Sequence, residues 1–148
     1  APKDAFEAAL RWRDLGGGEA AEHCIAAALM GLGQYREAAG RLEKLAKRSK
    51  RKADVKAGLL AHSAQAWILA GQSFRAETVL TAALKLTPDD SALMIDRAQA
   101  RAGTRDYAGA VEAVASTGGQ HRHGQENKQG SGAEDLGHAN DQARTRYR

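Results

Sequence analysis

The stretch WILAGQSFRAETVLTAALKLTPDD, residues 67–90, contains the pattern that decides the fold of this chain. Apolar residues recur in it every three or four positions, which is the period of an α-helix with one buried side. Pro88 cannot extend that helix, and Asp90 is a residue type that caps the start of a new one. The stretch therefore predicts a helix over 74–86, followed by a short turn and a further helix.

The same helical period continues up to about residue 115, with almost no sign of β-strands. Short runs of glycine, proline or charged residues separate the helical segments. Seven helices are predicted, over residues 3–15, 19–31, 35–48, 53–70, 74–86, 90–102 and 106–115. Because the connections are short, consecutive helices are expected to lie antiparallel as neighbours, and the predicted fold class is all-α.

Alanines recur in register within this series. At three places an alanine is followed four positions later by an aliphatic residue. Each of these alanines has another alanine twelve positions before it. The pairs are Ala26 with Ala38, Ala64 with Ala76, and Ala98 with Ala110, so successive units are 38 and 34 residues apart. A side chain larger than a methyl group would push two closely crossing helices apart, so the pairs predict three tightly packed helical units.

These units resemble the tetratricopeptide repeat (TPR) family, in which a glycine, an aromatic residue, an alanine and a closing proline recur over about 34 residues. The three units read Gly33-Gln-Tyr35-Arg-Glu-Ala38, then Gly71-Gln-Ser-Phe74-Arg-Ala76 with Pro88, then Asp106-Tyr107-Ala-Gly-Ala110. The resemblance implies a TPR-like stack of antiparallel helical hairpins, a right-handed α-solenoid of about three units, as one repeat domain over residues 1–115.

The resemblance also implies a function, because the first helices of successive TPR units line a concave groove in which peptides dock. Carried over by phase, the groove residues are His23, Ala27, Met30, Ala61, Gln65, Ile68, Ile95 and Gln99. Segments 19–31 and 57–70 contain no Lys, Arg or Asn, which argues against recognition of a peptide's terminal carboxylate. The expected partner is an apolar segment of a peptide or protein, and the alternative is that these residues pack against neighbouring helices.

Positive charge is concentrated in one window. The formal net charge of the chain is +4, and residues 41–56 hold eight bases and two acids. The predicted basic patch consists of Lys44, Lys47, Arg48, Lys50, Arg51 and Lys52. Binding of nucleic acid or another acidic surface through the run 44–56 is the alternative function, although no aromatic residue interleaves the run for base stacking. The competing interpretation is a solvated helix end, where cations are favoured.

No group of residues in the sequence indicates catalysis, a cofactor or a metal. His23 and Cys24 are adjacent in a helix, so their side chains point about 100° apart and do not form a nucleophile–base pair. His121, His123 and His138 lie in a polar segment without zinc-ligand spacing. No stretch approaches the length of a membrane-spanning helix. The sequence predicts a non-catalytic protein without a cofactor, a metal site or a membrane span.

The helical pattern ends before residues 116–148, which contain six glycines and only one aliphatic residue larger than alanine, Leu136. Such a composition buries too little apolar surface to offset the entropy of ordering, so a disordered tail is predicted. Because the break falls inside the last predicted helix, we hypothesise that the repeat array is interrupted there, for example by a frame change. An uncapped last unit also makes self-association an option.

A chain beginning at Ala1 fits a cytoplasmic protein, or a periplasmic or secreted one that has lost a leader.

Overall fold

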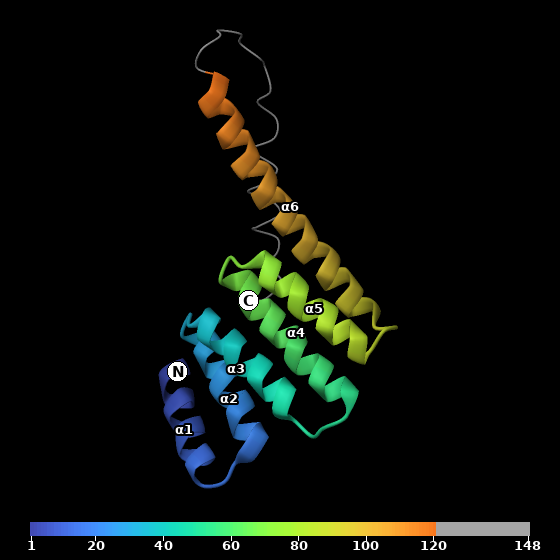
Figure 1. Ribbon diagram of the computed structural model, residues 1–148. Coiled ribbons are helices and arrows are strands. Elements are labelled where there is room, and N and C mark those ends of the chain that lie inside the picture. The colour runs from blue at the N-terminus through green and yellow to red at the C-terminus, as the bar shows by residue number, and fades with distance from the viewer. Residues whose placement is uncertain (121–148) are drawn as a thin grey trace.

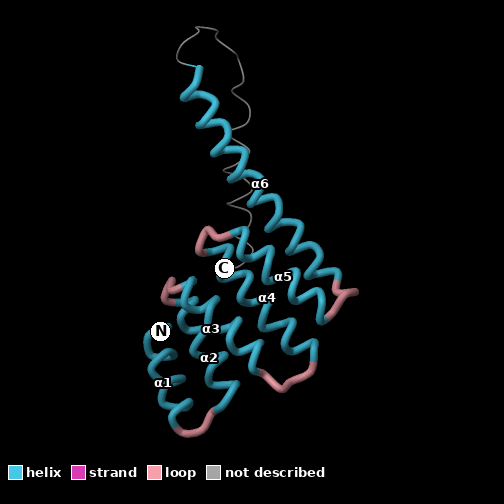
Figure 2. The backbone as a smooth tube through the Cα atoms, in the orientation of Figure 1, coloured by secondary structure: helices cyan, strands magenta, loops and turns pink. Residues whose placement is uncertain are grey.

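The computed structural model describes residues 1–120, which form six α-helices and, within that range, no strand (Figure 2). The helices are α1 (Pro2–Asp14), α2 (Gly18–Gly31), α3 (Tyr35–Arg48), α4 (Ala53–Leu69), α5 (Ser73–Leu86) and α6 (Ser91–Gln120). The all-α prediction is confirmed, and the predicted bounds of the first five helices are correct to within one residue at each end.

Each helix packs mainly against the helices that precede and follow it in the chain. Figure 1 shows α1 to α5 side by side in sequence order, with α6 beside α5. Just over half of the buried apolar residues are alanines. Because the alanine side chain is a single methyl group, such a core is filled only when the helices pack close together. Larger side chains such as Ile25, Leu42 and Leu80 fill the space between these contacts and are also fully buried.

The burial expected of the paired alanines is confirmed in the first two units, and the expected burial of Ala98 in the third is wrong. Ala26, Ala38, Ala64 and Ala76 are all at most 1% exposed, as close helix contacts require. Ala98 is exposed instead, and Ala100 together with Leu93 forms the buried side of α6. The side chain of Ala110 lies outside the described part of the structure.

The last two predicted helices, 90–102 and 106–115, are one continuous helix, α6. Gly103 lies between the two predicted helices, but its φ is not positive, and a Cβ atom there would lie 2.7 Å from the Ser73 Oγ. Glycine at this position therefore allows α6 to approach α5 closely. Because α6 does not fold back on itself, no later helix within residues 1–120 covers Ala98, and the end of α6 extends beyond the other helices (Figure 1).

The continuation of α6 to Gln120 also covers the first residues of the predicted tail. The remainder of that tail, 121–148, lies outside the described residues, as do the three histidines that the sequence places in it.

The turns that follow α2 and α4 have the same geometry. Gly33 and Gly71, 38 residues apart, both have a φ of +76°, a left-handed conformation that favours glycine. The backbone N–H of the next residue closes each turn at 2.8 Å, with Gln34 donating to the Leu29 carbonyl and Gln72 to the Trp67 carbonyl. The repeat recognised in the sequence therefore corresponds to a repeated backbone conformation.

This geometry predicts a stability effect for Gly33→Ala. An L-residue in the left-handed region costs roughly 1–2 kcal/mol, so the free energy of unfolding should fall by about that amount in a urea titration. The control is Gly58→Ala in the exposed middle of α4, where a Cβ atom meets nothing within 4 Å. This second change should raise stability by roughly 0.5–1 kcal/mol. Equal effects of the two changes would contradict the assigned turn.

Candidate functional site

The residues predicted to line a groove are distributed over three helices. His23, Ala27 and Met30 lie on α2; Ala61, Gln65 and Ile68 lie on α4; Ile95 and Gln99 lie on α6. None of these eight side chains is fully buried. Ala27, Ile95 and Gln99 are exposed, and the other five are half-buried.

Three of the half-buried residues also have a structural role. Met30, Ala61 and Ile68 pack against the main core cluster. For these positions the alternative interpretation, packing against neighbouring helices, therefore applies at least in part. Ile95 is different, because its side chain is 52% exposed and apolar. Because Ile95 is not among the residues packed against the core cluster, its surface can be changed without removing a core contact.

The structure brings together two histidines on this face. The His23 Nε2 on α2 lies 3.1 Å from the His62 Nδ1 on α4, and the two rings stack with their centroids 5.3 Å apart and their planes inclined by 29°. His62 was not among the predicted site residues. The signal for it was available, because the two histidines are 39 residues apart, close to the repeat spacing of 38.

The neutral form of the His62 imidazole is favoured. Partial desolvation of the ring lowers its pKa below the usual 6.5, and the proximity of His23 lowers it further. A neutral imidazole has one nitrogen with a free lone pair and one N–H, so the pair is able to share a proton between the facing nitrogens. Above the lowered pKa, His62 therefore contributes no charge to the face.

The basic patch lies at the C-terminal end of α3 and in the segment that follows this helix. Lys44, Lys47, Arg48, Lys50, Arg51 and Lys52 are all exposed. The guanidinium of Arg48 lies 3.8 Å from the Glu22 carboxylate, and that of Arg51 lies 3.8 Å from the Glu19 carboxylate. Two of the six cations therefore face acids of α2. The end of α3 at Arg48 agrees with the interpretation of the run as a helix end.

A buried serine holds this end of α3 against α2. Ser49, which follows the last residue of α3, is 3% exposed and donates its Oγ–H to Glu19 Oε2 at 2.8 Å. The backbone N–H of Arg51 donates to the same Ser49 oxygen at 3.2 Å. The segment that carries the basic run is therefore anchored by a neutral residue that the sequence did not single out.

Trp67 belongs to the core between α3, α4 and α5. Its indole N–H donates to the Glu43 carboxylate on α3, and the guanidinium of Arg75 on α5 lies over the ring, 4.7 Å from its centre. Ser63 donates to the Ala39 carbonyl at 2.9 Å in the same α3–α4 contact. The ring connects three helices and is almost fully buried.

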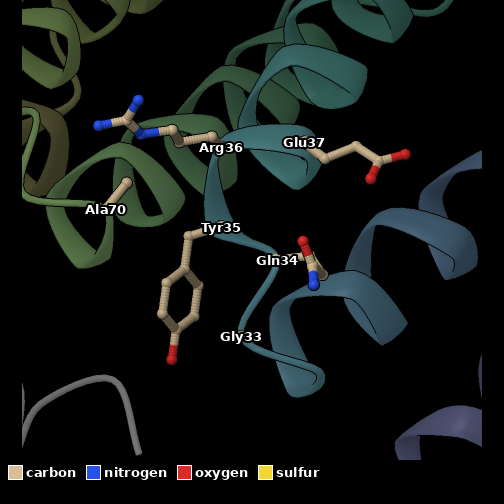
Figure 3. Close-up of a pocket in the computed structure, with 6 residues that line it drawn as sticks. All are labelled: Gly33, Gln34, Tyr35, Arg36, Glu37 and Ala70. Atoms are coloured by element: carbon tan, nitrogen blue, oxygen red, sulfur yellow. The ribbon is translucent and has the colours of Figure 1, made fainter.

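A shallow, open pocket lies where the α2–α3 turn meets the end of α4 (Figure 3). Its lining consists of Gly33, Gln34, Tyr35, Arg36, Glu37 and Ala70. In Figure 3 the charged ends of Arg36 and Glu37 point in opposite directions, so the charged groups do not converge on one point. The pocket is the space beside the turn aromatic, and nothing in its lining indicates a particular chemistry.

Within residues 1–120, no group of three or more His, Cys, Asp or Glu side chains is placed to hold a metal ion. In the same part of the chain, no helix combines the length and the apolar character that a membrane span requires. No protein-family model matches the sequence, and comparisons with curated proteins and with solved structures also give no match.

Proposed function

We propose that the chain is a non-catalytic, TPR-like interaction module in which α2, α4 and α6 form one binding face for an apolar segment of a peptide or protein. In this proposal α2 with α3 and α4 with α5 are antiparallel hairpins of a right-handed stack. The single α6 is the first helix of a third unit. The face consists of His23, Ala27, Met30, Ala61, Gln65, Ile68, Ile95 and Gln99.

The accessibility of this face carries the proposal. All eight side chains remain at least partly accessible, and none of them is an acid, a lysine or an arginine. An uncharged, partly apolar surface that spans several helices is typical of a site for a protein segment. The repeated turns at Gly33 and Gly71 support the assignment of α2 and α4 to equivalent positions in two units.

Nucleic-acid binding through the run 44–56 is the weaker candidate. Its affinity would come from neutralised phosphates, and Arg48 and Arg51 already face carboxylates on α2. Binding to RNA or DNA that falls steeply between low and moderate salt would favour this candidate over the interaction module.

The experiment is a selection of random peptides against the full chain, followed by affinity measurements on the selected sequences. We expect apolar peptides, and we expect Ile95→Glu to weaken their binding at least about tenfold, about 1.4 kcal/mol, by placing a charge on the face. Ile95 is preferable to Ile68 for this test, because Ile68 packs against the core and its replacement would also affect folding.

The matched control is Phe74→Glu, which introduces the same charge at an exposed apolar residue of α5, outside the proposed face. Both variants should keep the wild-type circular dichroism spectrum. Unchanged binding by Ile95→Glu, or an equal loss in both variants, would exclude the α2–α4–α6 face as the binding surface.

A further inference from the structure

We propose that His23 and His62 form a binding site for a divalent transition-metal ion of the Zn²⁺ type, on the surface between α2 and α4. The sequence predicts no such site, because the two ligands come from different helices and neither belongs to a metal-binding motif. The inference stands on the geometry of the two rings and does not depend on the proposed peptide-binding function.

The distance between the two facing nitrogens suits a shared metal ion. Zinc binds imidazole nitrogen at about 2.0–2.1 Å, so two such ligands of one tetrahedral ion lie roughly 3.3 Å apart, and at a right angle roughly 2.9 Å apart. The His23 Nε2 and His62 Nδ1 lie 3.1 Å apart, between these two values. The rings come from separate helices and stack with their planes inclined by 29°, so metal binding requires at least one ring to rotate until both in-plane lone pairs point at the ion.

The chemistry of the pair also fits. Imidazole suits zinc, copper and nickel, and it binds them through the lone pair of its neutral form. In the pair without metal, one ring donates its N–H to the other. When a metal binds, the donor ring moves that proton to its other nitrogen, so both facing nitrogens present lone pairs and no net proton is lost.

Two protein ligands leave coordination positions for water. Because no third His, Cys, Asp or Glu in residues 1–120 is placed to join a metal site, the ion would keep at least two open positions if it is tetrahedral. Such a site is accessible and exchanges its ion readily, unlike a closed structural zinc site. Cys24, next to His23, is exposed, and we expect it to take no part.

The test is a titration of the full chain with ZnCl₂, in which isothermal calorimetry measures the binding. His121, His123 and His138 are replaced by alanine in the parent protein, so that the tail cannot supply histidine ligands. We expect one Zn²⁺ per parent chain. Mutation of a residue that merely hydrogen-bonds to a metal ligand typically weakens metal binding by about 10–100-fold. Loss of a ligand itself, in His23→Gln or His62→Gln, should therefore weaken Zn²⁺ binding by at least about tenfold.

Cys24→Ser is the matched control and should bind Zn²⁺ as the parent does. Absence of binding by the parent, or unchanged binding in both histidine variants, would overturn the proposal, as would a loss confined to Cys24→Ser. Zinc-induced changes in the ring resonances of His23 and His62 in the parent give a second readout that needs no variant. Shifts at other residues with unchanged histidine signals would equally overturn it.

Discussion

Replacement of Trp67 by alanine should lower the free energy of unfolding by about 3–5 kcal/mol, the largest loss we expect from a single change in this chain. The indole is 6% exposed and lies where α3, α4 and α5 meet. Its removal leaves a cavity, takes the N–H donor from Glu43, and leaves the guanidinium of Arg75 without the ring beneath it. Urea unfolding followed by far-ultraviolet circular dichroism measures the effect.

The chain contains its own control, because its other tryptophan, Trp12 on α1, is 46% exposed. Trp12→Ala removes the same side chain from a position with less burial and should cost clearly less stability. Trp67→Phe separates the two contributions of Trp67, since it keeps most of the buried area but removes the donor to Glu43. A loss in Trp67→Ala no greater than that in Trp12→Ala would show that Trp67 does not hold the three helices together.

The first five helices were predictable because local signals and packing requirements agree. Gly33 and Gly71 end α2 and α4 in a conformation that glycine adopts easily, and Ala64 and Ala76 recur where helices approach closely. Asp90 caps α6 as expected, accepting the Leu93 backbone N–H at 3.2 Å. The glycines and Asp90 satisfy the backbone, and the alanines satisfy the packing of neighbouring helices.

Gly103 shows why α6 was not predictable in the same way. Glycine ends a helix in one context and permits close helix packing in another, and the sequence does not distinguish the two. Only the position of the Ser73 side chain beside Gly103 shows that close packing applies here. The exposure of Ala98 follows from the same difference, because the expected second helix of that unit is the continuation of α6.

Helical phase was sufficient to predict that the eight proposed groove residues are accessible, but not what they contact. All eight lie on α2, α4 and α6 and are at least partly exposed. The contact of His23 with His62 depends on how two helices approach each other, and this distance is not encoded in either segment alone. The same is true of the hydrogen bond from Trp67 to Glu43, which joins residues 24 positions apart.

The second large effect concerns the methyl-sized contact at Ala76. Ala76→Leu should lower the free energy of unfolding by about 1–3 kcal/mol, because the added carbon atoms must displace side chains or move a helix. Ala76 is 0% exposed and belongs to the core cluster that also contains Ala64. Leucine is nearly as good a helix former as alanine, so the loss cannot come from helix propensity. Urea unfolding again provides the measurement.

Ala82→Leu makes the same substitution in the same helix at an exposed position, and its effect should stay within about 0.5 kcal/mol of wild type. A difference between the two variants isolates the contact between helices from every property of leucine itself. If Ala76→Leu is tolerated as well as Ala82→Leu, the helices have room to separate. The alanines would then not determine their spacing, and the assignment of α4 and α5 to a closely packed repeat unit would lose its physical basis.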